Sequence, residues 1–192
     1  MNKKIFTIFF LIFQGCTSTV LPNKEKNLAD FIPQEQKKVE INFDENQEFN
    51  FVNENFPKKC EWANLIRVVD GDTIYVNYEN KNTKVRFIGI DTPEIFHPNK
   101  PVEEFGLEAS KKTKELLKNK EKICLISDEI GDSYDKYDRK LSYIFTNDGT
   151  DINAELLKQG LARGYYYFPF EREDEFRFYE HIAKKSQKNI WK

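Results

Sequence analysis

Two short segments of the chain bring carboxylates together, each directly after a strand-like stretch. They are Asp70-Gly71-Asp72-Thr73 and Asp91-Thr92-Pro93-Glu94. An Asp-Gly pair alone is an ordinary hairpin turn, so the first segment is a weak signal. The second combines two carboxylates and a hydroxyl with a proline that restricts the backbone. Carboxylates so close together raise one another's pKa unless a cation neutralises them, and such hard oxygen ligands suit Ca²⁺ or Mg²⁺.

Two arginines at the ends of predicted strands add positive charge to this set. Arg86 precedes Asp91, and Arg139 begins a later strand. A single arginine is most often surface charge, but its guanidinium is also a fork-shaped donor that suits phosphate oxygens. A zinc site is not expected, because the chain has 2 His and because Cys60 and Cys124 lack C-x-x-C spacing. The set indicates phosphate chemistry with a hard cation.

The elements that must position these residues are predicted within residues 60–192. Runs of β-branched and alternating residues, separated by turn residues, predict five strands, of which the first three form an antiparallel meander. We expect an α+β fold, mainly β: a five-stranded OB-fold barrel with three α-helices. The predicted strands are 63–70, 73–78, 84–90, 123–127 and 139–145, and the predicted helices are 102–119, 153–159 and 172–188.

The composition of the whole chain narrows the class of protein. Its 192 residues include 30 Lys+Arg and 32 Asp+Glu, and the mean hydropathy is −0.70. These values exclude a multi-span membrane protein and a protein that coats DNA by bulk positive charge. The aromatic content of 15% excludes a wholly disordered chain. What remains is a soluble globular domain with additional sequence.

The additional sequence begins with a predicted signal peptide at residues 1–16. A short basic start precedes an apolar run at 5–13, which is too short to span a membrane but has the length of a signal-peptide core. Gly15-Cys16 then resembles the bacterial lipoprotein signal, in which the cysteine is lipidated. We expect export and lipid anchoring to a bacterial membrane, facing outside the cytoplasm. The alternative is ordinary cleavage and secretion, with Cys16 incidental.

Residues 17–59 are rich in Asn, Glu, Gln and Lys and contain three prolines. This composition is typical of a flexible tether that holds a domain away from a membrane. Two apolar stretches within it, at 39–43 and 49–52, are each compatible with a short strand or a docking segment.

Six segments in residues 60–192 resemble, in this order, the signature segments of the staphylococcal nuclease (thermonuclease) family. They are Val69–Thr73, Val85–Glu94, Glu108–Ser110, Asp135–Arg139, Gly160–Ala162 and Asn189–Trp191. The resemblance implies an endo- and exonuclease dependent on Ca²⁺ that hydrolyses DNA and RNA, breaks the P–O5′ bond and leaves 3′-phosphorylated products. Asp72 and Asp91 would hold Ca²⁺, with the backbone carbonyl of Thr92 as a further ligand.

Three side chains would carry the catalysis by the same resemblance. Glu94 would orient or deprotonate the attacking water, Arg86 would brace the phosphate, and Arg139 would stabilise the developing charge. Asp138 departs from the family pattern, in which Gly is usual. If the backbone there has a positive φ, Asp tolerates it less well than Gly, and its charge lies beside Arg139.

The substrate is expected to be single-stranded or denatured DNA and RNA, bound by a monomer. Lys136 and Tyr137 resemble family residues that contact the terminal phosphate and the nucleotide. The tyrosine run at 165–167 aligns ambiguously by one residue, and Tyr166 and Tyr167 are the expected base contacts. Tyr165 is equally compatible with plain packing. Stacking on such rings suits unpaired bases.

The resemblance also places the first strand beside the strand that contains Cys124, so Cys60 and Cys124 could pair. An exported domain lies in a compartment that permits disulfides. Two buried free thiols are the alternative, and the sequence leaves both open.

Two other functions remain beside the nuclease. One is a catalytically weak OB-fold module that binds nucleic acid or protein. Relatives of that kind usually lack some of the acidic and arginine residues that are all present here. The other is a surface lipoprotein in which residues 17–59 contact a partner.

Overall fold

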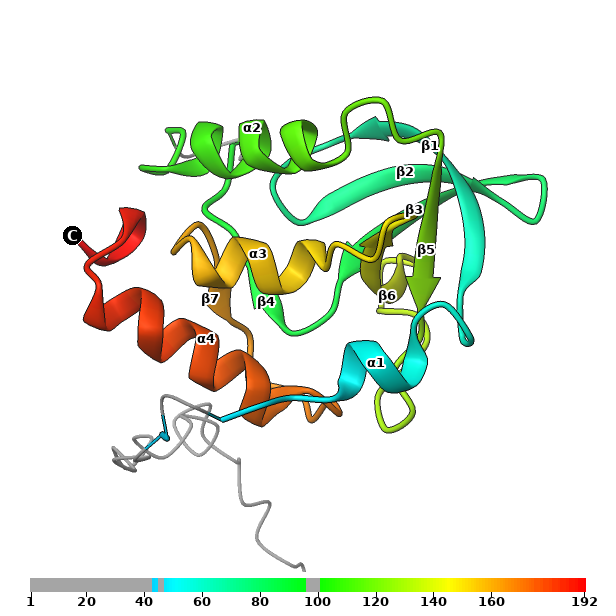
Figure 1. Ribbon diagram of the computed structural model, residues 1–192. Coiled ribbons are helices and arrows are strands. Elements are labelled where there is room, and N and C mark those ends of the chain that lie inside the picture. The colour runs from blue at the N-terminus through cyan, green and yellow to red at the C-terminus, as the bar shows by residue number, and fades with distance from the viewer. Residues whose placement is uncertain (1–42, 45–46, 96–100) are drawn as a thin grey trace, which may run out of the picture. The chain divides into compact units, whose positions relative to one another are not determined.

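Five strands of the computed structural model close into a barrel in the order β1-β2-β3-β6-β5 (Figure 1). The structure describes residues 43–44, 47–95 and 101–192. Neighbouring strands are antiparallel except β3 and β6, which are parallel. The expected five-stranded α+β barrel and its antiparallel meander are therefore confirmed. The strands are β1 (Glu61–Val68), β2 (Thr73–Tyr78), β3 (Lys81–Phe87), β5 (Lys122–Ile126) and β6 (Lys140–Thr146).

The barrel is filled by alternate side chains of its strands. Ile74 and Val76 of β2 and Val85 and Phe87 of β3 are buried, as expected for strands that face the core on one side. Strands β5 and β6 are buried along almost their whole length. Their second face is covered as well, because α3 (Ile152–Lys158) packs against β6.

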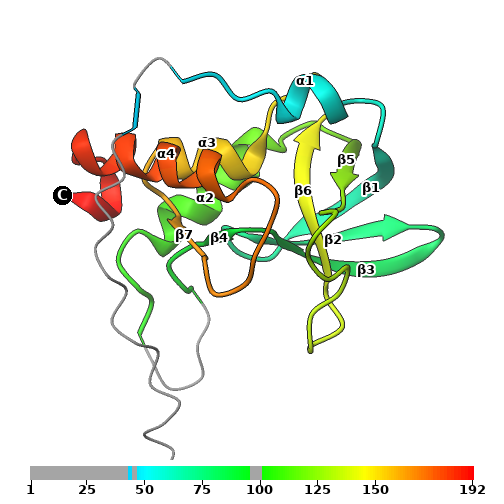
Figure 2. The same ribbon diagram turned by 90° about the horizontal axis from the view of Figure 1, so that it is seen from below.

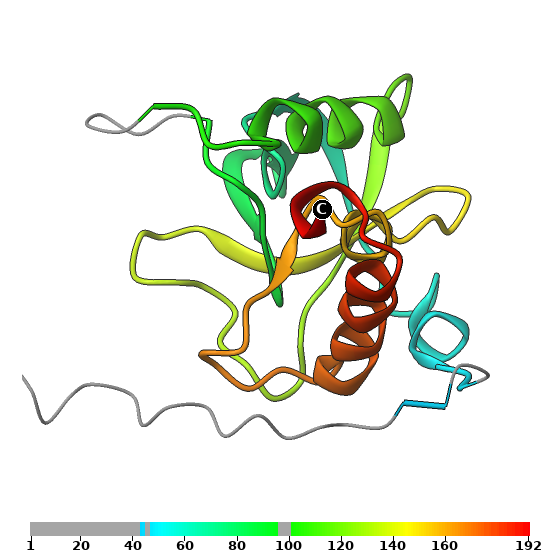
Figure 3. The same ribbon diagram turned by 90° about the vertical axis from the view of Figure 1, so that its left-hand side faces the viewer.

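Three helices lie on one side of the barrel: α2 (Gly106–Leu116), α3 and α4 (Glu173–Lys185). Figure 2 shows these helices beside the barrel strands, and Figures 1 and 3 show α3 between the other two. The Asp151 side chain accepts the Ala154 N–H at 3.0 Å, which caps the start of α3. No helix within the described residues is long and apolar enough to cross a membrane.

Helix α2 is shorter than the predicted 102–119. Phe105 adopts a left-handed φ of 66°, so the helix begins only at Gly106. The N–H of Glu103 donates instead to the carbonyl oxygen of Glu94 at 2.9 Å. A tertiary contact with the preceding loop thus replaces the first predicted turn of the helix.

A separate two-stranded sheet pairs β4 (Ile90–Asp91) with β7 (Arg163–Gly164) and has no counterpart among the predicted strands. The predicted strand 84–90 is interrupted at Gly89, where φ is 71°. A Cβ atom on Gly89 would lie 2.6 Å from a ring carbon of Phe170. Both the backbone conformation and the available space therefore require glycine there, and the turn redirects the chain toward Asp91.

Residues 47–59 pack against the barrel. A fourth helix, α1 (Phe51–Asn55), lies in this segment, and Phe51 is buried. The ring centroid of Phe51 is 5.1 Å from that of Tyr143, and Phe56 lies 5.8 Å from Phe145. The segment thus completes the cover over β6, and the docking alternative for 49–52 describes it better than a strand.

The compact unit extends from Phe43 to Lys192. This differs from the expected domain boundary at Cys60, because Phe51 of the predicted tether is buried in the domain and Phe56 packs against its core. The predicted signal peptide, Cys16 and the remaining residues up to Asn42 lie outside the described residues.

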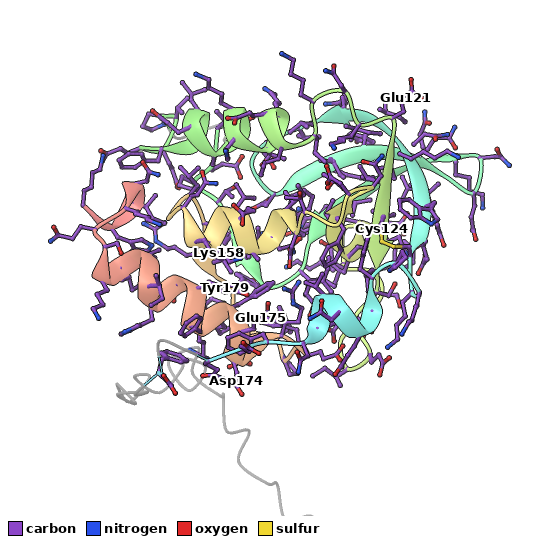
Figure 4. The ribbon with its side chains drawn as sticks, in the orientation of Figure 1. Glu121, Cys124, Lys158, Asp174, Glu175 and Tyr179 are labelled. Atoms are coloured by element: carbon purple, nitrogen blue, oxygen red, sulfur yellow. A yellow bond between two sulfur atoms is a disulfide. The ribbon has the colours of Figure 1, made fainter. Side chains whose placement is uncertain are left out.

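A disulfide joins Cys60, just before β1, to Cys124 in β5, and Figure 4 labels Cys124. Of the two alternatives left open by the sequence, the structure has the paired form. Because Cys60 directly follows the docked segment, the disulfide ties that segment to the barrel.

An ion-pair cluster anchors α4. Arg172, whose side chain is 1% exposed, pairs with Asp151 and with Glu175. The hydroxyl of Tyr179 donates to Glu175 at 2.9 Å, and the Lys158 ammonium lies 4.4 Å from the Tyr179 ring centroid (Figure 4). These contacts hold α4 against the start and end of α3.

Candidate active site

A cleft of about 640 Å³ lies where β2 begins and β3 ends. The D-G-D turn and the β4 segment line one part of it, and the loops at 128–139 and 165–170 line another. The structure brings most of the sequence-predicted site residues to this cleft. They are Asp72, Arg86, Asp91, Thr92, Glu94, Lys136, Tyr137 and Arg139.

Asp72 joins the two acidic segments. Its Oδ2 atom accepts the Thr92 N–H at 2.8 Å and the Thr92 hydroxyl at 3.1 Å. Its Oδ1 atom accepts the Thr73 hydroxyl at 3.0 Å, and its own N–H donates to Asp70 Oδ1 at 3.2 Å. The carboxylate is buried and its orientation is fixed by these donors.

Arg86 is held in a fixed orientation by the backbone. Its Nη1 atom donates to the carbonyl oxygens of Phe87 and Ile90 at 2.8 and 2.7 Å. Its Nη2 atom is 2.7 Å from Asp91 Oδ1 and 3.2 Å from Asp72 Oδ2. One guanidinium therefore bridges the carboxylates of both acidic segments.

The site carries an excess of negative charge. Burial raises the pKa of Asp70 to about 6, and the neighbouring Asp72 charge adds to the shift. Burial also raises the pKa of Asp91, although the Arg86 guanidinium opposes the shift, and Asp72 again contributes. Both shifts arise because these carboxylates share a partly desolvated site, where a bound cation would stabilise their charged forms.

The donor chemistry fits a hard cation. Asp72, Asp91 and the Thr92 carbonyl offer only oxygen, the ligand type of Ca²⁺ and Mg²⁺. Within the described residues, no group of three or more His, Cys, Asp or Glu side chains converges to hold a metal. Ca²⁺ takes about six to eight oxygen ligands, so water or substrate oxygens would complete the shell around such a cation.

Glu94 is an exposed residue that lines the cleft close to the start of α2. Its N–H donates to Glu103 Oε2 at 3.2 Å. A Cβ atom on Gly106 would lie 3.1 Å from the Glu94 carbonyl oxygen. The start of α2 therefore packs closely against the backbone that carries this carboxylate.

Arg139 stands at the start of β6 and is oriented by Asp135. Its Nε atom donates to Asp135 Oδ2 at 2.6 Å and its N–H to Asp135 Oδ1 at 3.0 Å.

Asp138 adopts a φ of 59°, so this position has the backbone conformation for which Gly is favoured. The Lys136 ammonium and the guanidinium carbon of Arg139 lie 5.0 and 5.4 Å from the ring centroid of Tyr137, whose side chain is exposed.

The tyrosine run is placed differently from the expectation. Tyr165 and Phe168 line the cleft, whereas Tyr166 and Tyr167 are not among its lining residues. The Tyr166 ring stacks 6.2 Å from Phe170, and Arg177 lies 3.8 Å from its centroid. Of the tyrosines at 165–167, Tyr165 is therefore the one that faces the cleft.

Asp128 is a residue of the cleft that the sequence reasoning missed. Its Oδ1 atom accepts the N–H groups of Ile130 and Gly131 at 2.9 and 2.8 Å. Its Oδ2 atom accepts the Glu171 N–H at 2.8 Å and the Tyr143 hydroxyl. It therefore fastens together the two loops that line the cleft. Its place two residues after β5 is the only sequence signal that could have singled it out.

Residues 84–192 match the family model described as Staphylococcal nuclease homologue. The chain belongs to the staphylococcal nuclease family. Within this family match lie Arg86, Asp91, Glu94 and Arg139, and Asp72 precedes it. The family match therefore includes four of these five site residues.

Individual relatives extend the similarity. The chain is 44% identical over 136 residues to the Endonuclease YncB of Bacillus subtilis (strain 168), covering 70% of this chain and 63% of that protein. It is 45% identical over 129 residues to the SPbeta prophage-derived endonuclease YokF of the same organism, covering 66% and 43%. It is 41% identical over 129 residues to the Thermonuclease of Staphylococcus hyicus, covering 66% and 73%. The match spans less than two thirds of the length of both B. subtilis relatives.

Proposed function

We propose that this member of the staphylococcal nuclease family is a Ca²⁺-dependent nuclease. It hydrolyses DNA and RNA at the P–O5′ bond and leaves 3′-phosphorylated products. The observation that carries the proposal is the bridging of Asp72 and Asp91 by Arg86, in a cleft that Glu94 and Arg139 also line. Relatives named as an endonuclease and a thermonuclease support the same activity.

The two arginines bind the phosphate. Strands β3 and β6 are parallel neighbours, and Arg86 is in register with Leu141, two residues beyond Arg139. The arginines therefore emerge from adjacent strands, where they can contact the same phosphodiester. Arg86 braces the phosphate, and Arg139 stabilises the charge that develops on its oxygens as the P–O5′ bond breaks.

Asp72, Asp91 and the Thr92 carbonyl hold the cation. When bound, Ca²⁺ neutralises phosphoryl oxygens and lowers the barrier to attack on an anionic diester. The protein's own part is to fix these ligands, which the Thr73 and Thr92 donors to Asp72 accomplish.

Glu94 orients and deprotonates the attacking water. Its exposed position in the cleft gives its carboxylate access to solvent. The water oxygen attacks phosphorus, its proton passes to Glu94, and the P–O5′ bond breaks as the O5′ oxygen takes up a proton from solvent. The guanidinium carbon of Arg139 lies 5.4 Å from the ring centroid of Tyr137, one of the proposed nucleotide contacts.

The substrate is single-stranded or denatured DNA and RNA. Exposed rings at the cleft, Tyr137 and Tyr165, offer stacking faces to bases of any identity. The protein has a formal net charge of −2, so its affinity depends on the local cations of the cleft rather than on bulk charge. We propose that it acts as a monomer.

The test is cleavage of denatured DNA and of RNA by the protein with Ca²⁺ and then with EGTA. We expect Ca²⁺-dependent cleavage with a 3′-phosphate on the products, and a rate loss of about 10²–10³-fold for Arg139→Gly. Glu94→Gln is the matched variant for the water-activating role. Absence of cleavage with retained binding of nucleic acid would instead establish the binding module.

We propose further that the protein is exported and lipid-anchored through Cys16, with secretion after ordinary cleavage as the alternative. The support is the signal-like sequence of residues 1–16. Metabolic labelling with a fatty acid tests this: label on the wild-type protein that is absent from Cys16→Ala is expected. Unlabelled wild-type protein in the medium would favour secretion.

A further inference from the structure

Two large apolar side chains are exposed at the active-site cleft and have no role in the proposed chemistry. Ile130 is 61% exposed and Phe168 is 68% exposed. Both line the cleft, although they come from different loops. Single exposed apolar residues are common, but adjacent ones that line a cleft mark a binding surface.

The two loops lie side by side and are fastened together. Asp128 accepts the N–H group of Ile130 in the first loop and that of Glu171, which directly follows the second loop. A Cβ atom on Gly131 would lie 3.6 Å from the Pro169 carbonyl oxygen. The backbones next to Ile130 and Phe168 therefore lie close together, in loops that the hydrogen bonds of Asp128 join.

The apolar pair continues the aromatic lining of the cleft. The ring centroids of Phe168 and Tyr165 are 6.2 Å apart, with an angle of 34° between the rings. Tyr165 is the tyrosine that faces the cleft. A strand that places one base near Tyr165 therefore has its next base within reach of Phe168.

We propose that Ile130 and Phe168 form a seat for one unpaired base of the substrate strand, adjacent to the base at Tyr165. This inference rests on the proposed nuclease function, because it assigns a further binding position in the same cleft. The occupant is a nucleobase because the seat lies in the same cleft as Arg86 and Arg139, the proposed phosphate contacts, and beside the ring of Tyr165. Every base has an apolar face, so the seat tolerates any sequence but excludes bases that remain paired in a duplex.

Binding of a fluorescein-labelled single-stranded octathymidylate, measured by anisotropy in EDTA, tests the seat without cleavage. Phe168→Ala and Ile130→Ala are compared with Leu107→Ala, which removes an equally exposed side chain of α2 that does not line the cleft. We expect Phe168→Ala to weaken binding by about 5- to 150-fold, the range for one stacked base. The control should bind like the wild type.

Octamers with a single abasic position locate the base. At one position, loss of the base should weaken wild-type binding as much as Phe168→Ala does, and the two changes together should cost no more than either alone. At the other positions the two losses should add. This non-additivity distinguishes a base contact from general loss of loop structure.

Three results would overturn the seat without removing the nuclease function. The first is wild-type cleavage with Ca²⁺ while both variants bind like Leu107→Ala, which leaves the nuclease function intact. The second is full additivity at every abasic position. The third is self-association of the wild type that Phe168→Ala abolishes, which would make the pair an interface between copies of the chain. Failure of the wild type both to bind and to cleave would remove the nuclease function together with the seat.

Discussion

The hydroxyl of Thr113 donates a hydrogen bond of 2.6 Å to the carbonyl oxygen of Gly71. Thr113 is a fully buried residue of α2, and Gly71 is the centre of the turn that supplies Asp72. A Cβ atom on Gly71 would lie 2.6 Å from Thr92 Oγ1. The turn is therefore held between the helix on one side and the second acidic segment on the other.

Thr113→Val should destabilise the protein and weaken its response to Ca²⁺. The substitution keeps the volume but leaves the buried Gly71 carbonyl without its donor, which costs about 1–3 kcal/mol in the free energy of unfolding. Urea denaturation and a Ca²⁺ titration of activity measure the two effects. Thr113→Ser keeps the hydroxyl and serves as the control, so equal behaviour of the two variants would contradict a role for this hydrogen bond.

Asp138→Gly and Asp138→Asn should both raise kcat/KM at low salt. Each removes a negative charge next to Arg139. The interaction of two unit charges about 4 Å apart in water is worth about 1 kcal/mol, which corresponds to about fivefold in rate. The gain should shrink as ionic strength rises, because salt screens exposed charges. Kinetics on denatured DNA at two salt concentrations measure this effect. Activity unchanged at low salt in both variants would show that Asp138 does not oppose phosphate binding.

Only Asp138→Gly should also change stability. Asn tolerates the left-handed φ of 59° about as well as Asp, whereas Gly has no Cβ penalty there. The midpoint of urea denaturation should therefore rise for the Gly variant and stay unchanged for the Asn variant. The reverse order would be inconsistent with strain at this position.

Reduction of the Cys60–Cys124 disulfide should lower the free energy of unfolding by about 4 kcal/mol in the chain-entropy model. The bridge closes a loop between residues that are 64 positions apart. Urea denaturation with and without a phosphine reductant measures the loss. The double variant Cys60→Ser/Cys124→Ala should respond identically in both conditions, and a similar response from the wild type would mean that the thiols are free.

Phe51→Ala should destabilise the domain by about 3–5 kcal/mol, as expected for a large buried aromatic side chain. The Phe51 ring lies 4.5 Å from the buried Arg172 guanidinium and 5.1 Å from the Tyr143 ring centroid. Urea denaturation measures this loss. The control is Val102→Ala, because the Val102 side chain is exposed. Wild-type stability of Phe51→Ala would return residues 47–59 to the role of a tether.

The strands of the barrel were predictable because their signal is local. Alternation of buried and exposed residues, as in β2, is written along a few consecutive positions. The two acidic segments and both arginines could be singled out for the same reason, since each group lies within a short stretch next to a predicted strand. Nothing in such a stretch, however, indicates that Glu103 bonds to the Glu94 backbone and delays the start of α2.

The tyrosine run shows where local pattern stops being sufficient. Tyr165 and Tyr166 are identical side chains at successive positions, and only their surroundings differ. Tyr166 packs against Phe170 and Arg177, whereas Tyr165 faces the cleft. These partners lie on the loop and helix that follow, so their positions depend on how α4 docks.

The barrel, the residue types of the site and the family could all be inferred from local stretches of sequence. The bridging of Asp72 and Asp91 by Arg86, the pairing of Cys60 with Cys124, and the inclusion of residues 47–59 in the domain became evident only in the folded structure. The physical reason is the range of the interactions. Strand formation follows from neighbouring residues, whereas hydrogen bonds, ion pairs and aromatic burial between distant segments exist only after the chain has closed on itself.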